Sequence, residues 1–294
     1  MTNLNFLKIG IAIALFSIGS VVCGCSSNVQ QESASLEPEL IVIESSNLKC
    51  NDSILVFTPA CCGKTEVSES KTLPTLFLLH GWSGCYKDWS NKHDIQQISN
   101  RTGFRIICPD GFYNSWYLNN TDTTKMQWRA FFDNECFPLL KEKYALVPDS
   151  TFITGLSMGG HGAVNLFLDH PENFRAAGSM SGVLDLQLTS LRDTELAKVI
   201  GDKKERVDSE SAAKRIIPMA EQLKAMNKPI IVTCGYHDVY AKCTEVFSQK
   251  CRELDIPHIK ILSPGKHSWP YWGFALEQHL WHFNKILNNE NLGY

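Results

Sequence analysis

The chain has 294 residues, of which 44% are hydrophobic and 20% are charged, so it is long enough and apolar enough to bury one large core. Its formal net charge is -3 at pH 7 and it has no run of lysine and arginine, so electrostatics favour neither nucleic acid nor an anionic membrane surface as a partner. An α/β domain of this size is often single, and we expect one folded domain over residues 39–294.

Residues 1–24 are typical of an export signal. After Lys8, an uncharged apolar run extends over residues 9–22, which is the length of a signal-peptide core and too short to cross a bilayer. It ends in Val22-Cys23-Gly24-Cys25, an order similar to the lipobox of bacterial lipoproteins. We expect lipidation of Cys25, a flexible tether over residues 25–38, and export as a membrane lipoprotein, periplasmic or at the cell surface. Cleavage by an ordinary signal peptidase and secretion as a soluble protein is the alternative.

Nine of the 11 cysteines lie beyond Cys25, and no two of the nine have Cys-x-x-Cys spacing. A metal site and a thioredoxin-like motif therefore lack their sequence signature, and no metal is predicted. Export would permit disulfides, but an odd count leaves at least one thiol free. Cys108 and Cys234 lie in apolar runs, so we expect them in the core.

The first predicted strands are residues 40–43 and 53–58, which we expect to form an antiparallel edge of the sheet. The apolar run 76–79 is typical of a buried parallel strand and leads into His80-Gly81-Trp82-Ser83-Gly84. A glycine-rich turn at the carboxyl end of such a strand can present backbone N–H groups to a substrate, so we expect the Trp82 N–H to be an oxyanion donor. The alternative is a plain strand-ending turn with Trp82 packed in the core.

Further predicted elements are a helix over residues 89–101, a strand over 104–108 and a helix over 127–144 that Pro138 kinks or breaks. Residues 112–120 form an aromatic and polar loop on the side of the strand ends. Such a loop either makes a wall of a substrate pocket or simply packs.

A strand-like run at residues 151–154 meets Gly155-Leu156-Ser157-Met158-Gly159, and a helix-like segment follows. A serine on a tight strand-to-helix turn holds strained backbone dihedrals, and the glycines two residues away on each side provide the room. The hydroxyl then projects above the sheet. The Met158 N–H, unpaired at the helix start, points to where charge gathers on an attacked carbonyl oxygen. This context predicts a nucleophile elbow, although the motif alone arises readily by chance.

Beyond the elbow, strands and helices continue to alternate, so we predict an α/β fold with a mostly parallel sheet and helices on both faces. Residues 186–227 are charge-rich helical pieces containing Pro218, as in an insertion or a cap over the site. The remaining predicted elements are strands at 176–181, 229–234 and 257–262, a helix at 239–254 and a closing helix from about residue 271.

Ser157, Asp238 and His267 each follow a predicted strand, so all three are expected at one edge of the sheet. A serine hydroxyl is a poor nucleophile at neutral pH and needs a base, and an imidazole base needs an acid to fix its tautomer. We therefore expect His267 to take the proton of Ser157 and Asp238 to orient His267.

Each partner of the serine has rivals. His237 also follows a strand, but it is adjacent to the acid, and the order serine, acid, histidine favours the later histidine. His80 and His161 are expected to support the neighbouring loop and helix by packing or hydrogen bonding. Asp185 is the main competitor for the acid, and capping of the following helix is the alternative role of Asp238.

Four motifs in chain order together resemble the α/β-hydrolase "putative esterase" family, which includes esterase D (S-formylglutathione hydrolase), tributyrin and feruloyl esterases and mycolyltransferases. The motifs are His80-Gly81-Trp82-Ser83-Gly84, Gly155-Leu156-Ser157-Met158-Gly159-Gly160, Cys234-Gly235-Tyr236-His237-Asp238 and Gly265-Lys266-His267-Ser268-Trp269. The resemblance implies carboxylester hydrolysis without a cofactor, with Ser157, Asp238 and His267 as triad and the Met158 and Trp82 N–H groups as oxyanion donors. It leaves short-chain, acetyl-sugar and feruloyl esters open as substrates.

The sequence therefore predicts an exported serine carboxylesterase that acts on a small-molecule or carbohydrate-linked ester through an acyl-enzyme on Ser157. An acyltransferase of the same fold is the first alternative, since it differs only in passing the acyl group to an alcohol instead of water. A hydrolase-fold surface protein that only binds its partner is the second. The intact set of triad residue types argues against this second alternative, because a binding protein needs no such set.

Overall fold

The computed structural model describes residues 37–60 and 73–290 of the chain. The predicted leader, Cys25 and the predicted tether up to residue 36 lie outside this part. Among the helices of the described part, none combines the length and the apolar character needed to cross a membrane.

Eight strands form one sheet in the order β1-β2-β4-β3-β5-β6-β7-β8. β1 pairs with β2 and β2 with β4 in antiparallel orientation, and all other neighbours are parallel. The predicted antiparallel edge and mostly parallel sheet are thus confirmed. The strands are β1 (Glu39–Ser45), β2 (Cys50–Phe57), β3 (Thr75–Leu79), β4 (Arg105–Cys108), β5 (Thr151–Gly155), β6 (Ala176–Met180), β7 (Ile230–Gly235) and β8 (His258–Ser263).

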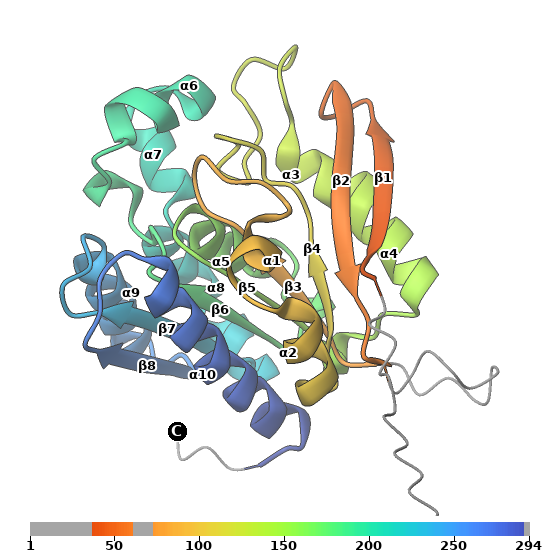
Figure 1. Cartoon of the computed structure of the whole chain (residues 1–294). Helices are drawn as coiled ribbons and strands as arrows, with labels where there is room; N and C mark the ends of the chain where they lie inside the picture. Colours follow the sequence, from red (N-terminus) through yellow and green to blue (C-terminus); the bar gives the residue numbers. More distant parts are fainter. Residues whose placement is uncertain (1–36, 61–72, 291–294) are drawn as a thin grey trace, which may run out of the picture. The chain divides into compact units, whose positions relative to one another are not determined.

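The central strands are buried on both faces, and alternate side chains enter two different cores. On β3, for example, Phe77 and Leu79 belong to one core and Leu76 and Leu78 to the other. Helices α2 and α10 lie in front of the sheet and helices α5 and α8 behind it (Figure 1). This layering explains why the parallel strands read as unbroken apolar runs in the sequence.

The helices divide between the two faces according to the core that they join. The front face carries α1 (Asp88–Lys92), α2 (Ile95–Thr102) and α10 (Trp269–Leu287). The back face carries α3 (Trp128–Phe131), α4 (Phe137–Tyr144), α5 (Met158–Asp169), α8 (Ala212–Met226) and α9 (Ala241–Glu253).

Two predicted helices are interrupted in ways that the sequence pattern did not predict. The helix expected over residues 89–101 is two helices, because Asp94 leaves the helical conformation and accepts a hydrogen bond from the Gln97 N–H as N-cap of α2. The helix expected over residues 127–144 is broken by a π-helical turn, η2 (Phe132–Cys136). Pro138, at which the sequence predicts a kink or break, lies directly after this turn, at the start of α4.

Residues 186–227 contain several short helices before α8, namely η5 (Leu186–Leu188), η6 (Arg192–Leu196), α6 (Ala197–Ile200) and α7 (Lys204–Glu210). α8 has 15 residues and continues through Pro218. The segment is thus helical as predicted, and its longest helix is not ended by the proline.

Candidate active site

The strand β5 ends at Gly155 and helix α5 starts at Met158, so Ser157 occupies the turn between them. Its backbone has φ 52° and ψ -115°, a conformation that L-residues rarely adopt. A Cβ on Gly159 would lie 2.4 Å from the carbonyl oxygen of His80, and one on Gly155 would lie 2.6 Å from the backbone of Gly159. The predicted strained elbow is therefore present, and its glycines are required by close backbone approach.

The structure brings the three predicted triad residues together. His267 Nε2 lies 3.0 Å from Ser157 Oγ, and His267 Nδ1 lies 3.0 Å from each carboxylate oxygen of Asp238. A carboxylate accepts, so Nδ1 carries the proton and Nε2 is left to accept from the serine hydroxyl. The side chain of Asp238 is fully buried and that of His267 is 25% exposed, so the base can be reached from the cavity while the acid is shielded from water.

Asp238 also accepts a hydrogen bond from the Tyr240 N–H at 2.8 Å, which closes the turn between β7 and α9. Of the two roles that the sequence left open for this carboxylate, the structure shows the contact with the histidine, whereas α9 has Tyr240 as its N-cap and no side-chain cap hydrogen bond. One oxygen serves both partners, and the turn fixes the direction of the carboxylate toward the imidazole.

Two aromatic rings flank the His267 imidazole. The Tyr240 ring is 5.0 Å away at an interplanar angle of 76°, and the Trp272 ring is 4.9 Å away at 90°. Both side chains are only 7% exposed. The imidazole is therefore held from two sides by edge-to-face contacts in addition to its hydrogen bonds.

The loop after β3 lies against the elbow. A Cβ on Gly81 would lie 2.5 Å from Leu156 Cδ1 and 3.6 Å from Ser157 Cβ, so the backbone of this loop approaches Ser157 closely. In the described part of the chain, neither the Trp82 N–H nor the Met158 N–H donates to a protein acceptor. Two backbone donors are therefore free beside Ser157, where an oxyanion would form.

His80 supports this loop by hydrogen bonds and is not part of the hydrogen-bonded set Asp238, His267 and Ser157. Its Nδ1 donates to the Gly81 carbonyl at 2.8 Å, and its Nε2 accepts from the Gly111 N–H at 2.7 Å. The Tyr117 hydroxyl donates to the His80 carbonyl at 2.9 Å. This support by hydrogen bonding agrees with the expectation from sequence.

The other rivals lie away from Ser157 Oγ. His161 is buried on α5 beside Asn165, and burial lowers its pKa to about 3, so it stays neutral. The Asp185 carboxylate accepts from the Gln187 N–H at 3.0 Å as N-cap of η5. The side chain of His237 is exposed. Within the described residues, only His267 reaches the serine hydroxyl.

A cavity of about 530 Å³ opens over Ser157 and His267. Its walls come from the loop after β3, the start of α1, the segment after η5, the loop after β7 and the start of α10. Apart from the elbow, the catalytic histidine candidate and its neighbour Ser268, the lining residues are Gly81, Trp82, Ser83, Asp88, Ser190, Leu191, Val239, Tyr240, Trp269, Pro270 and Trp272.

Sequence reasoning found the reactive groups of this cavity and missed most of its walls. Asp88, Leu191 and Trp272 come from three elements and share no spacing that a motif could reveal. Trp269 lies within the histidine motif, and its nearness to His267 was the one available signal.

The aromatic loop at residues 112–120 does not line this cavity. Phe112 and Tyr113 line a separate hollow of about 230 Å³ together with Met126 and Val199. Trp116 and Tyr117, by contrast, are buried in the core. The loop touches the site only indirectly, because the Tyr113 ring contacts that of Trp82 at 5.3 Å.

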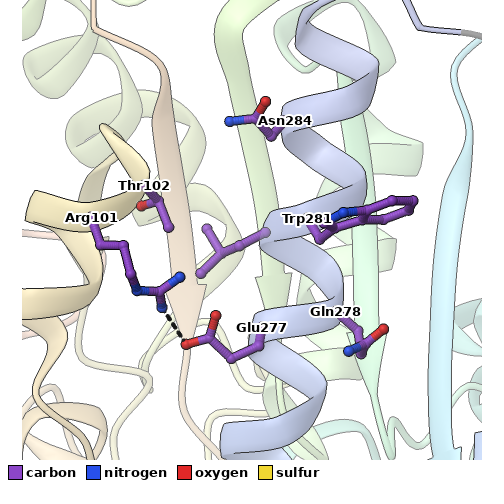
Figure 2. A pocket seen from close by; sticks show the side chains of 7 residues that line it. Arg101, Thr102, Glu277, Gln278, Trp281 and Asn284 are labelled. Atoms are coloured by element: carbon purple, nitrogen blue, oxygen red, sulfur yellow. Dashed lines mark hydrogen bonds and ion pairs between the residues drawn. The ribbon is translucent and has the colours of Figure 1, made fainter. Parts of the chain in front are cut away.

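Another hollow, of about 550 Å³, lies between α2 and α10 (Figure 2). Its polar contact is the ion pair of Arg101 with Glu277, whose side chains are 55% and 41% exposed. An exposed pair of this kind contributes little to stability. The hollow contains none of the predicted site residues.

Cys108 and Cys234 are buried, as predicted. The cysteines of the described part are all free thiols, namely Cys50, Cys85, Cys108, Cys136, Cys234, Cys243 and Cys251. Over residues 37–60 and 73–290, no group of three or more His, Cys, Asp or Glu side chains is placed to hold a metal ion.

A parallel sheet with a serine on a strand-to-helix turn, and an acid and a histidine on later strand ends, defines an α/β-hydrolase. Comparison with known proteins agrees. A family model described as "Putative esterase" matches residues 45–283. An acetyl esterase of Caldicellulosiruptor saccharolyticus is 26% identical over 240 residues, which cover 76% of this chain and 90% of that protein. The S-formylglutathione hydrolase of Mus musculus is 24% identical over 266 residues, which cover 82% of this chain and 91% of that protein.

Among solved structures, a ferulic acid esterase superposes with a TM-score of 0.72 at 24% identity and covers 85% of this chain and 99% of that chain. This likeness concerns the fold. The chain belongs to the "Putative esterase" family of α/β-hydrolases. It is a serine esterase, as the sequence predicted.

Proposed function

We propose that Ser157 is the nucleophile of this esterase and that the reaction passes through an acyl-enzyme. The observation that carries the proposal is the continuous row from Asp238 through His267 to Ser157, with 3.0 Å at each step. A serine, a base within hydrogen-bond reach and an acid that orients the base are the groups that acyl transfer needs.

In the first half of the reaction, Ser157 Oγ attacks the acyl carbon while its proton passes to His267 Nε2. The carbonyl oxygen becomes an oxyanion, which accepts hydrogen bonds from the Met158 and Trp82 N–H groups. The alcohol then departs with the proton held by Nε2, and Ser157 keeps the acyl group. Asp238 stabilises the transient imidazolium and does not itself take up the proton.

In the second half, a water molecule attacks the acyl-enzyme and gives its proton to His267 Nε2. Collapse of the second tetrahedral intermediate releases the carboxylic acid and returns the proton to Ser157 Oγ. Each turnover thus consumes one water and one ester and yields one acid and one alcohol.

The test is covalent labelling by a fluorophosphonate probe together with hydrolysis of p-nitrophenyl acetate. Wild type is expected to label and to turn over. Ser157→Ala is expected not to label and to lose kcat by a factor on the order of 10⁴ or more. Ser209→Ala, a change at an exposed serine of α7, is the matched control. A folded Ser157→Ala variant that keeps its turnover contradicts the proposal.

The substrate is proposed to be a small-molecule or carbohydrate-linked ester with a short-chain, acetyl or feruloyl acyl group. The acetyl esterase among the relatives supports the short end of this range. A panel of p-nitrophenyl esters of increasing chain length, with methyl ferulate and acetylated xylan, separates the classes. A kcat/KM that is highest for the longest chain contradicts the assignment.

We also propose that the protein is exported and anchored by a lipid on Cys25. The support is the sequence order Val22-Cys23-Gly24-Cys25 after an apolar run. Cys25→Ala is expected to move the protein from the membrane fraction to the soluble fraction. An unchanged partition contradicts the anchor and leaves the proposed chemistry intact.

A further inference from the structure

Asp88 lines the cavity above Ser157, although the proposed reaction does not use it. It is the first residue of α1, directly after the loop that carries the Trp82 N–H. Its side chain folds back on this loop, since a Cβ on Gly84 would lie within van der Waals distance of the carboxylate. The side chain is half-buried, so part of the carboxylate faces the cavity.

This carboxylate has no cationic partner in the described part of the chain. Within the described residues, the polar contact of its oxygens is with the Cys85 thiol, whose Sγ lies 3.6 Å from Asp88 Oδ1. The neighbouring Lys87 is turned to the Tyr86 ring, with Nζ 5.3 Å from its centroid. No lysine or arginine lines the cavity, so Asp88 gives its wall an uncompensated negative charge.

Helix α1, which begins with Asp88, lies next to the histidine loop. In the proposed reaction His267 protonates the alcohol oxygen, so the alcohol lies along the histidine loop. Trp269 is two residues after His267, and its ring packs at 5.3 Å against that of Trp89, the residue next to Asp88. Asp88 therefore lines the same cavity as the loop along which the alcohol departs.

Three tryptophans, Trp82, Trp269 and Trp272, also line the cavity. Aromatic faces attract cations and pack against uncharged groups. The charge of Asp88 and the aromatic rings thus both favour a cationic group on the substrate.

We propose that Asp88 is a specificity-determining residue, which makes the site select esters of cationic or uncharged alcohols and reject esters whose alcohol carries an anionic group. The inference rests on the proposed function, because it needs acyl transfer at Ser157 to be measured. It adds a property of the alcohol part, which the family and the triad leave open.

The test uses three acetyl thioesters whose thiols share a two-carbon chain and differ in its terminal group: thiocholine (cationic), 2-mercaptoethanol (neutral) and 3-mercaptopropionate (anionic). Hydrolysis of each consumes one water and releases acetate and the free thiol, which a colour reagent measures. Wild type is expected to show a kcat/KM for the cationic ester at least about tenfold above that for the anionic ester at low salt. The ratio is expected to shrink as salt is added.

The ratio, and not the absolute rate, is the readout for the variants. Asp88→Asn is expected to bring the ratio close to one, and Asp88→Glu to retain most of it. Asp202→Asn removes the same charge at an exposed position outside the cavity and is expected to keep the wild-type ratio. A wild-type ratio near one, or a ratio that Asp88→Asn leaves unchanged, overturns the inference.

Labelling of Ser157 by phosphorothiolate probes with the same three leaving groups gives the ratio without turnover, so slow thioester hydrolysis does not block the test. If neither turnover nor labelling depends on Ser157, the proposed function fails and the inference fails with it. If both depend on Ser157 but not on the charge of the leaving group, only the role of Asp88 is wrong.

Discussion

Ser157 and His267 are held in different ways. The Ser157 N–H donates to the Met180 carbonyl at 2.9 Å, and the Ser157 carbonyl accepts from the His161 N–H at 3.0 Å, so backbone contacts fix the nucleophile. The His267 imidazole is fixed by side chains instead, through Asp238, Tyr240 and Trp272. A residue that is held by backbone contacts is marked by a short sequence motif. A residue that is held by side chains from several elements is not marked by such a motif. The two halves of the site should therefore respond differently to mutation.

The largest effect on activity is expected from a change at the turn that holds Ser157 by backbone contacts. Gly159→Ala places a Cβ 2.4 Å from the His80 carbonyl oxygen, and a backbone atom cannot move aside cheaply. The elbow and the loop after β3 must separate, which displaces both oxyanion donors. We expect kcat/KM to fall by a factor on the order of 10² or more, measured with p-nitrophenyl acetate.

Gly103→Ala is the matched control for this change. Gly103 has φ 76° and open space around its Cβ position, far from the site in the fold. The substitution is expected to cost about 1 kcal/mol of stability, seen as a lower Tm, and to keep kcat. A Gly159→Ala enzyme within tenfold of wild type would show that the elbow tolerates a Cβ and that the comparison is wrong.

The difference between the two halves also explains how much the sequence could predict. The buried strands were located to within one to three residues at their ends, because a strand covered on both faces is an unbroken apolar run. The elbow was predictable because Gly155 and Gly159 flank Ser157 for a local steric reason. The pairing of Ser157 with His267, which are 110 residues apart, followed only from their positions after strands of one sheet.

Features that depend on distant packing could not be predicted. The sequence predicted a kink or break at Pro138, but not the π-helical turn at Phe132–Cys136 that precedes it. The rings of Tyr240 and Trp272 flank His267 from two elements, and nothing in their spacing links them to it. The same holds for Asp88, whose place in the cavity depends on how α1 packs against the histidine loop.

A smaller effect on activity is expected from a change beside His267, which is held by side chains. Tyr240→Leu removes one ring beside His267, and the imidazole then has more freedom to leave the line toward Ser157 Oγ. We expect kcat to fall about tenfold, since small misplacements of a catalytic group are costly. Tyr240→Phe keeps the ring and loses only the hydroxyl contact with Thr189 Oγ1, so a loss of about twofold is expected.

Stopped-flow or steady-state kinetics of the two variants separate the ring from the hydroxyl. Equal losses for Tyr240→Leu and Tyr240→Phe would mean that the contact with Thr189 matters and the ring does not. The imidazole would then be held by Asp238 alone on that side of the site.

The smallest effect on activity is expected from a change at Asp52 on β2. This side chain is fully buried without a well-formed hydrogen bond, and burial, with a further contribution from the charge of Asp110, raises its pKa to about 8. Its reference pKa is 3.8, so between these two values the folded protein holds a proton that the unfolded chain has released. Stability from this group is complete below the lower value and is lost as the pH rises toward 8.

Urea unfolding at pH 6, 7 and 8 measures this loss. Wild type is expected to lose about 2 kcal/mol over this range from Asp52, and Asp52→Asn, which cannot ionise, to lose much less. The buried histidines His161 and His279, whose pKa values burial lowers to about 3, reduce stability at pH 6 relative to pH 7, but they do so equally in wild type and Asp52→Asn, so the difference between the two proteins reports Asp52. Asp202→Asn is the exposed control and should follow wild type. Parallel curves for wild type and Asp52→Asn would show that Asp52 is not protonated in the folded protein.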